Sequence, residues 1–321
     1  MDRLIDLIDD KNNPSVVGLD PTLKVVPSQL VQDAKASDFE YWPQALAMQF
    51  LRFNMAIIDA VADIVPAVKP QIAMYEALGP YGIHAYVATN EYARSKGLYV
   101  LGDVKRGDIG STSEAYAAHL RGVIPGPGTE DIAPLDPWQE DAFTVNPYMG
   151  SDGIIPFTNA AVEADKDLFV LVKTSNPSSS EVQDLVSADD GLTIADHVAD
   201  LVERWGESTR GRHGYSRVGA VVGATHPKAG AELRKRMPHT LFLVPGYGAQ
   251  GGSASDVAAM FADDGRGVLV NSSRGIIGAW RKSGRYRDDM TSDQALALVA
   301  SSAREAAERM RDDLYTALKE R

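Results

Sequence analysis

The chain alternates between short apolar segments and longer stretches with the spacing of amphipathic helices. Each apolar segment ends at glycine, proline or a polar residue, which is typical of the buried strands of a parallel sheet. The predicted strands are 15–20, 67–70, 98–103, 142–146, 168–173, 218–223, 241–245 and 267–271.

Helical spacing follows most of these strands, and a further helix is predicted at the N-terminus, over residues 2–9. The other predicted helices are 43–61, 82–96, 113–120, 194–205, 228–236, 254–261 and 292–318. This alternation predicts an α/β protein with a single (β/α)8 TIM barrel domain over residues 1–321. An open doubly wound sheet is the alternative, but Gly18-Leu19-Asp20-Pro21 is not the glycine-rich dinucleotide turn expected after its first strand.

One region, residues 122–141, does not follow the alternation. It is rich in proline and glycine and then in acidic residues. Loops of this length are uncommon in compact domains. We interpret it as a peripheral insertion after the third helix, away from any anion site, because its carboxylates would repel an anionic substrate.

Composition narrows the functional classes. The net charge of −12 argues against nonspecific binding to nucleic acid or to anionic membranes. The absence of cysteine excludes disulfides, thiolate zinc sites and cysteine nucleophiles. The N-terminal residues lack a signal-peptide pattern, and no apolar run reaches the roughly 18 residues that span a bilayer. We therefore expect a cytoplasmic protein.

The third predicted strand ends in a group of charges, Asp103, Lys105 and Asp108. Side chains alternate along a strand, so Asp103 and Lys105 are expected on the same side. Burying an unpaired charge costs several kcal/mol, so these groups must satisfy one another or act on a substrate. A purely structural ion-pair cluster remains the alternative at this point.

Other strand ends carry polar residues that have simpler explanations when each is taken alone. Asp20 before Pro21 is common in turns, and Lys69 could extend its charged end to solvent. Ser111 with Glu114 fits a helix capping box, which would account for hydroxyl groups near the third strand end.

The last two strand ends indicate a phosphate site. Four glycines in residues 246–252 allow a ligand to approach the backbone closely, and Arg274-Gly275 adds a guanidinium beside a flexible amide. In (β/α)8 barrels the loops after the seventh and eighth strands often bind phosphate, for which the planar arginine fork is suited. A glycine-rich turn with a surface arginine is the alternative.

Metal binding has little support in the sequence. The six histidines are scattered, and none shows HExxH spacing or a two-histidine-one-carboxylate grouping. Only His226 stands at a strand end, and we expect it to be structural. No metal and no cofactor are predicted.

Taken together, the strand ends resemble the orotidine 5′-phosphate decarboxylase family, in its longer bacterial subgroup. The family's DxKxxDIxxT motif matches in full from Asp103 to Thr112. The segments that carry the rest of the resemblance are Gly18-Leu19-Asp20-Pro21, Val68-Lys69-Pro70-Gln71, Val172-Lys173-Thr174-Ser175-Asn176-Pro177, Val222-Gly223-Ala224-Thr225, residues 244–252 and Asn271-Ser272-Ser273-Arg274-Gly275.

The resemblance implies a decarboxylase that converts orotidine 5′-phosphate into UMP and CO2 in pyrimidine biosynthesis, without a cofactor. It also implies a homodimer with shared active sites. The roles implied by the resemblance are a proton donor to C6 at Lys105, a charge network of Lys69, Asp103, Lys105 and Asp108, a ribose contact at Asp20, a pyrimidine contact at Ser175, a phosphate site at Gln250, Arg274 and Gly275, and a reach into the neighbouring subunit by Asp108 and Thr112.

These roles fit the chemistry of the residues. Loss of CO2 leaves a vinyl carbanion, which a fixed ammonium at Lys105 would stabilise before donating a proton. Flanking carboxylates should favour the charged form of Lys105, which we expect to be buried between them.

Two alternatives stay open. A relative that uses a metal-stabilised enediolate would share DxKxxD but place an acidic ligand where this chain has Lys69. A barrel that only binds a phosphorylated nucleotide, or a purely structural dimer, is the other.

Overall fold

The computed structural model describes residues 1–124, 126–129, 131–132, 135–248 and 250–321. Its eight strands are parallel and follow one another in chain order around a closed barrel, which confirms the predicted fold class. The strands are β1 (Ser15–Leu19), β2 (Ala67–Pro70), β3 (Tyr99–Arg106), β4 (Ala142–Val145), β5 (Asp167–Lys173), β6 (Val218–Val222), β7 (Phe242–Val244) and β8 (Val268–Ser272).

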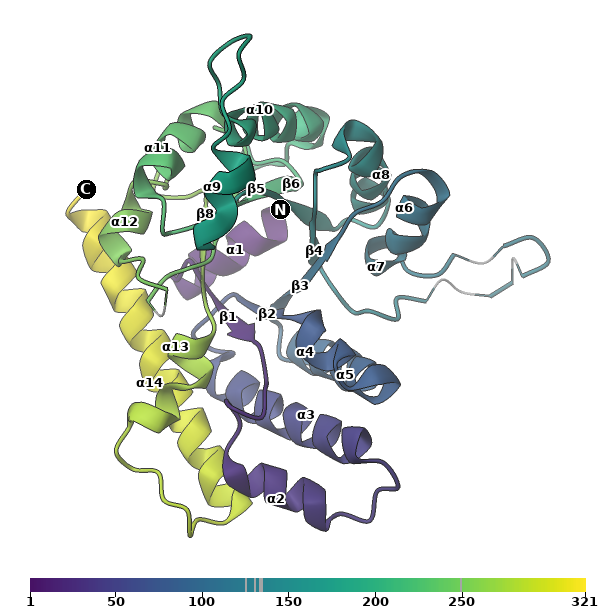
Figure 1. Ribbon diagram of the computed structural model, residues 1–321, viewed down its shortest axis with the longest axis vertical. Helices are drawn as coiled ribbons and strands as arrows, with labels where there is room; N and C mark the ends of the chain where they lie inside the picture. Colours follow the sequence, from purple (N-terminus) through teal and green to yellow (C-terminus); the bar gives the residue numbers. More distant parts are fainter. Residues whose placement is uncertain (125, 130, 133–134, 249) are drawn as a thin grey trace. The chain divides into compact units, whose positions relative to one another are not determined.

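Helices separate successive strands along the chain (Figure 1). They are α1 (Asp2–Lys11), α2 (Ser28–Ala36), α3 (Trp42–Val61), α4 (Ile72–Glu76), α5 (Gly79–Ser95), α6 (Gly110–Tyr116), α7 (Ala118–Arg121), α8 (Ile155–Glu163), α9 (Ser180–Gln183), α10 (Ile194–Gly206), α11 (Pro227–Arg236), α12 (Ala254–Ala258), α13 (Arg274–Ile277) and α14 (Ser292–Lys319). Short 3-10 helices are η1 (Gly150–Gly153), η2 (Pro177–Ser179), η3 (Glu207–Thr209) and η4 (Ala279–Lys282). Among the described helices, none is long and apolar enough to cross a membrane.

The strands lie where they were predicted because almost all residues of their apolar runs are buried. Every residue of β1, β4 and β6 is buried, as expected when helices cover one face of a parallel barrel and side chains fill the other. The third strand is the main difference, since it runs on through the charged residues as far as Arg106.

The chain divides into two compact units. The first unit comprises Met1–Asp6, Lys105–Asn271 and Leu314–Arg321, and the second comprises Leu7–Val104 and Ser272–Asp313. Within the second unit, α2 and α3 lie side by side, and α3 also packs on α5 (Figure 1). Within the first unit, α10 packs on α11 and on β6.

The insertion is described only in part. Pro125, Glu130, Ala133 and Pro134 lie outside the described residues, as does Ala249 in the loop after β7. Within the insertion, Val123 and Leu135 form an isolated antiparallel bridge.

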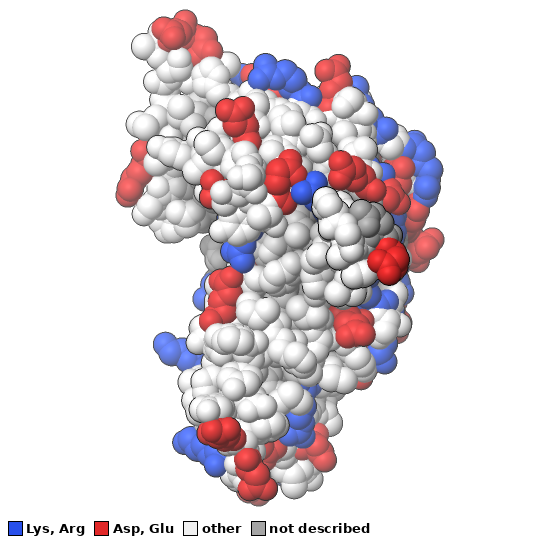
Figure 2. Space-filling view, turned by 90° about the vertical axis from the view of Figure 1, so that its right-hand side faces the viewer, with Lys and Arg blue, Asp and Glu red and all other residues white. Residues whose placement is uncertain are grey.

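Charged groups are mixed on the surface. On the face drawn in Figure 2, the acidic and basic side chains of the described residues are interspersed. The net charge of −12 is therefore not gathered on this face into a single acidic area.

One buried cation holds the loops that lead into the last two strands. Arg234 of α11 is 8% exposed, and its guanidinium donates to the carbonyl oxygens of Met260, Met237, Thr240 and Gly267, each at 2.8 Å. It also lies over the Phe242 ring, 3.6 Å from the centroid. Burial lowers the pKa of Arg234 to about 10, so the group is still charged at neutral pH.

Replacing Arg234 with methionine is expected to destabilise the protein strongly. The change leaves four carbonyl oxygens without their donor, and since each unsatisfied buried group costs about 1–3 kcal/mol, we expect a loss of about 3 kcal/mol or more. Urea unfolding midpoints measure the effect. Lys235→Met is the control, because Lys235 is exposed and makes one ion pair, with Glu232. Equal midpoints for the two variants would contradict this account of Arg234.

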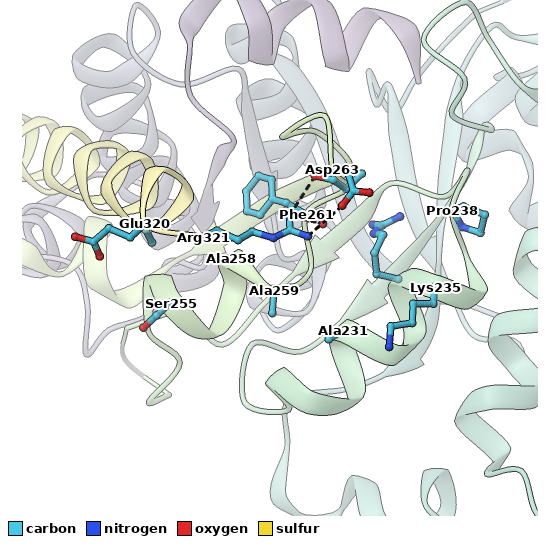
Figure 3. Close-up of a pocket in the computed structure, with 13 residues that line it drawn as sticks. Ala231, Lys235, Pro238, Ser255, Ala258, Ala259, Phe261, Asp263, Glu320 and Arg321 are labelled. Carbon is cyan, nitrogen blue, oxygen red and sulfur yellow. Dashed lines mark hydrogen bonds and ion pairs between the residues drawn. The ribbon is translucent and has the colours of Figure 1, made fainter.

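A cavity of about 820 Å³ opens beside Arg234 in the first unit, between α11, α12 and the end of α14 (Figure 3). Arg321 reaches across it and donates to the carbonyl oxygens of Phe261 at 2.8 Å and Ala262 at 3.2 Å. None of the predicted site residues lines this cavity. Both arginines are already engaged by carbonyl groups, so we do not assign a ligand to it.

Candidate active site

The clearest charged contact at a strand end lies in the second unit, between β2 and β3. Lys69 Nζ donates to Asp103 Oδ2 at 2.6 Å, and the two residues are 4% and 7% exposed. The parallel pairing of β2 with β3 brings them together. This pair is therefore held by the barrel itself and not by mobile loops.

The pair has a third charged neighbour in Asp20, which directly follows β1. Burial alone would lower the pKa of Lys69, but the charges of Asp103 and Asp20, with the hydrogen bond to Asp103, outweigh it and raise that pKa. Oδ1 of Asp20 is buried and has no hydrogen-bond partner among the described residues. An acceptor of this kind is suited to a ligand hydroxyl group.

Lys105 is the first residue of the longest segment of the first unit, and its backbone conformation is unusual. Its φ of +47° is in the left-handed region, which costs a lysine of order 1 kcal/mol or more. Strained residues of this kind cluster at functional sites. Its amide donates to Thr144 Oγ1 of β4 at 2.9 Å, which holds this conformation. Alternation along an extended strand therefore does not determine where its side chain points.

The expectation that Lys105 is buried is wrong for the single chain, because the residue is exposed. The left-handed backbone at the end of β3 turns this position out of the buried strand. Asp103, two residues earlier, is buried as expected.

Asp108 and Thr112 lie just beyond β3, also in the first unit. Asp108 is half-buried, and its Oδ1 accepts from the amide of Ile109 at 2.8 Å. Thr112 is exposed in the first turn of α6. The alternative that Ser111 and Glu114 form a capping box is wrong, because the N-cap residue is Ile109 and no side chain caps the helix. Glu114 instead pairs with Arg121 at 2.6 Å.

Ser175 and Gln250 meet in the first unit, although 75 residues separate them along the chain. Ser175 Oγ donates to Gln250 Oε1 at 2.8 Å. A Cβ added to Gly223 would lie only 2.8 Å from Ser175 Cα, so glycine is needed there for close approach. Gly246, with φ of +101°, opens the loop that carries Gln250.

Arg274 and Gly275 begin α13, directly after β8, in the second unit. Arg274 is exposed, and its side chain makes no hydrogen bond or ion pair with any described residue. An unpaired guanidinium at a strand end is suited to an anionic ligand.

The ion pair of Lys173 was not predicted from the sequence. Its charge is buried at the end of β5 and is paired with Asp184 at 2.5 Å. The run of polar residues after β5 was visible in the sequence, but the partner, eleven residues further on, was not. No group of three or more histidine, aspartate or glutamate side chains in the described part of the chain could hold a metal ion.

A closed barrel of eight parallel strands, with charged side chains at the strand ends, defines a (β/α)8-barrel enzyme, whose chemistry lies at the carboxyl ends of the strands. Residues 16–288 match the family model described as "Orotidine 5'-phosphate decarboxylase / HUMPS family". The chain belongs to this family.

Two curated relatives show how much of the chain is shared. Orotidine 5'-phosphate decarboxylase of Rhodopirellula baltica is 46% identical over 267 residues, which are 83% of this chain and 84% of the relative. The protein of that name from Clostridium acetobutylicum is 36% identical over 319 residues, which are 99% of each chain.

A solved structure is similar over the same extent. The crystal structure of a putative orotidine 5'-phosphate decarboxylase from Streptomyces avermitilis is 32% identical, with a TM-score of 0.74 over 99% of this chain and 95% of the other.

Proposed function

We propose that the protein is a carboxy-lyase that converts orotidine 5′-phosphate into UMP and CO2 in pyrimidine biosynthesis. One observation carries the proposal: the DxKxxDIxxT motif is intact from Asp103 to Thr112, inside a family match that covers residues 16–288. The names of the similar curated proteins support the same substrate.

Lys105 is the proton donor in this proposal. As the bond from C6 to the carboxylate breaks, its electron pair stays on C6 and CO2 leaves. The Lys105 ammonium stabilises the carbanion and then transfers a proton to C6. The buried Lys69–Asp103 pair supports the proposed charge network, because Lys69 holds the Asp103 carboxylate in one place.

The remaining residues bind the substrate. Asp20 accepts from a ribose hydroxyl, which its unpartnered Oδ1 supports. Ser175 contacts the pyrimidine, and Gln250, Arg274 and Gly275 hold the 5′-phosphate. Phosphate contacts are remote from C6, so their binding energy would act on the reaction by closing the 246–252 loop.

A relative that uses a metal-stabilised enediolate is the second candidate, because it would share the DxKxxD residues from Asp103 to Asp108. Lys69 argues against it. An ammonium at the end of β2, where such a relative needs an acidic ligand, repels a divalent cation.

The test follows the ultraviolet absorbance of orotidine 5′-phosphate in the presence of EDTA. We expect conversion to UMP at a rate that EDTA leaves unchanged. Activity that is lost with EDTA and restored by Mg²⁺ would favour the metal-dependent relative.

We also propose a homodimer that completes each active site with Asp108 and Thr112 of the neighbouring subunit. Exposed apolar side chains of the first unit support it, with Tyr148 87% exposed and both Ile109 and Met149 51% exposed. A Cβ added to Gly153 would lie 3.2 Å from both the Asp108 carbonyl oxygen and Met149 Cβ, so Asp108 borders this surface. Exposed apolar side chains that lie close together are frequent at interfaces between subunits.

Mixing two inactive variants tests the shared site. Lys105→Ala and Asp108→Asn chains disable different parts of it, so a hybrid dimer keeps one intact site out of two. We expect activity to return after the two variants are dissociated, mixed and re-associated. The control mixes each variant with itself. Verified hybrids without activity would contradict the shared site.

We further propose that the enzyme acts in the cytoplasm and binds neither nucleic acid nor membranes; its net charge of −12 supports the absence of nonspecific binding to nucleic acid and anionic membranes.

A further inference from the structure

Lys173, the last residue of β5, carries a buried charge that the proposed reaction does not use. Its side chain is 3% exposed, and Nζ donates to Asp184 Oδ1 at 2.5 Å. Asp184 directly follows α9 and is 47% exposed. A buried ion pair is often no more stable than apolar residues of similar size, so stability alone does not explain a lysine here.

The end of β5 has a local irregularity at this residue. The register between β5 and β6 shifts between Leu171 and Lys173, so regular strand pairing is interrupted next to Lys173. The Lys173 carbonyl oxygen still accepts from the Gly223 amide at 2.7 Å, so the backbone of Lys173 is held at the strand end.

A second pair of contacts ties the next residue to the same helix. The Thr174 amide donates to Gln183 Oε1 at 2.9 Å, and Gln183 Nε2 donates back to Thr174 Oγ1 at 2.8 Å. Lys173–Asp184 and Thr174–Gln183 are thus neighbouring links between the end of β5 and the end of α9. We call these two links the β5–α9 brace.

Ser175, the next residue, is confined on its other sides. Its hydroxyl bonds to Gln250, its carbonyl oxygen accepts from Thr225 Oγ1 at 3.2 Å, and Gly223 approaches its backbone. Thr174 of the brace is bonded directly to Ser175 along the chain, so a shift of the brace would strain these contacts and move the Ser175 hydroxyl.

Two further side chains near Lys173, those of Ser179 and His226, carry no negative charge. Ser179 Oγ lies 3.5 Å from Lys173 Nζ and also 3.5 Å from His226 Nε2. Burial and the nearby Lys173 charge lower the pKa of His226, which favours a neutral imidazole beside the ammonium. Asp184 is then the group that balances the Lys173 charge.

On the basis of the proposed function, we propose that Lys173 is a positioning residue for the reaction. Its ion pair with Asp184 fixes residues 174–176, so that the Ser175 hydroxyl meets the pyrimidine in one orientation. Lys173 itself does not touch the substrate.

A double-mutant cycle tests the proposal. We expect Lys173→Met and Asp184→Asn each to lower kcat/KM by about 10- to 100-fold, the scale of a small misplacement of a binding group. In a Ser175→Ala background the same changes should matter by less than about twofold, because they act through Ser175. Lys235→Met, an exposed lysine of α11, is the control and should leave kcat/KM unchanged.

An equal loss in both backgrounds, or no loss in either, would overturn the proposal, since a general loss of stability would not depend on Ser175. Amide hydrogen exchange tests the β5–α9 brace independently of the proposed function. Lys173→Met should speed exchange at Thr174 by about tenfold or more, with or without turnover. If the wild-type protein does not decarboxylate but Lys173→Met still speeds exchange at Thr174, the proposed function is refuted and the brace is kept. If Lys173→Met leaves exchange at Thr174 unchanged, the brace is refuted.

Discussion

Replacement of Lys105 with alanine is expected to lower kcat by about four orders of magnitude or more, because one side chain supplies both the electrostatic stabilisation and the proton. The loss should not come from unfolding. Lys105 is exposed, and its backbone is held by the Thr144 hydroxyl through an amide that alanine retains. The measurement is turnover at saturating orotidine 5′-phosphate, with thermal unfolding recorded in parallel.

Two controls sharpen this result. Lys105→Arg keeps a positive charge, so the variant should still bind UMP. Because arginine releases a proton far less readily than lysine, its turnover should be slow. Lys35→Ala, at an exposed lysine of α2, should behave as wild type. A Lys105→Ala enzyme with wild-type kcat would show that another group protonates C6.

The change of Lys69 to methionine is expected to have the second largest effect. The change removes the ammonium that pairs with the buried Asp103 carboxylate and also interacts with Asp20. Removing one partner of a buried pair typically costs about 3–5 kcal/mol, and we expect a loss of stability on that scale together with a fall in kcat/KM. Urea unfolding and steady-state kinetics measure the two effects.

The stability deficit of Lys69→Met should stay constant around neutral pH and narrow only in strongly alkaline solution. Despite burial, the charges of Asp103 and Asp20 raise the pKa of Lys69, so the stability that its ammonium contributes is lost only as the pH rises through that raised pKa. Lys35→Met is the matched control in the same unit. A deficit that is absent at neutral pH would show that the Lys69–Asp103 pair contributes nothing to the fold.

The strands and the charged strand ends could be predicted because their signals are local. The apolar run before Asp103 identifies a strand whatever surrounds it, and parallel pairing then brings Lys69 beside Asp103. The prediction ended that strand at its first charge, although the backbone continues in strand pairing to Arg106.

The remaining features depend on packing that no local pattern reports. The φ of +47° at Lys105 follows from its neighbours in space, because lysine has no preference for that conformation. In the sequence, Arg234 looks like any other charged residue of a surface helix. In the structure, it lies over Phe242 and binds four carbonyl groups. Such contacts join segments that are far apart in the sequence.

The most direct test of the central claim uses orotidine 5′-phosphate labelled with ¹⁴C in its carboxylate. The purified protein, with EDTA present, is predicted to release the label as CO2 while forming an equal amount of UMP, and the Lys105→Ala protein is predicted to release almost none. Intact substrate after incubation with folded wild-type protein would contradict the account.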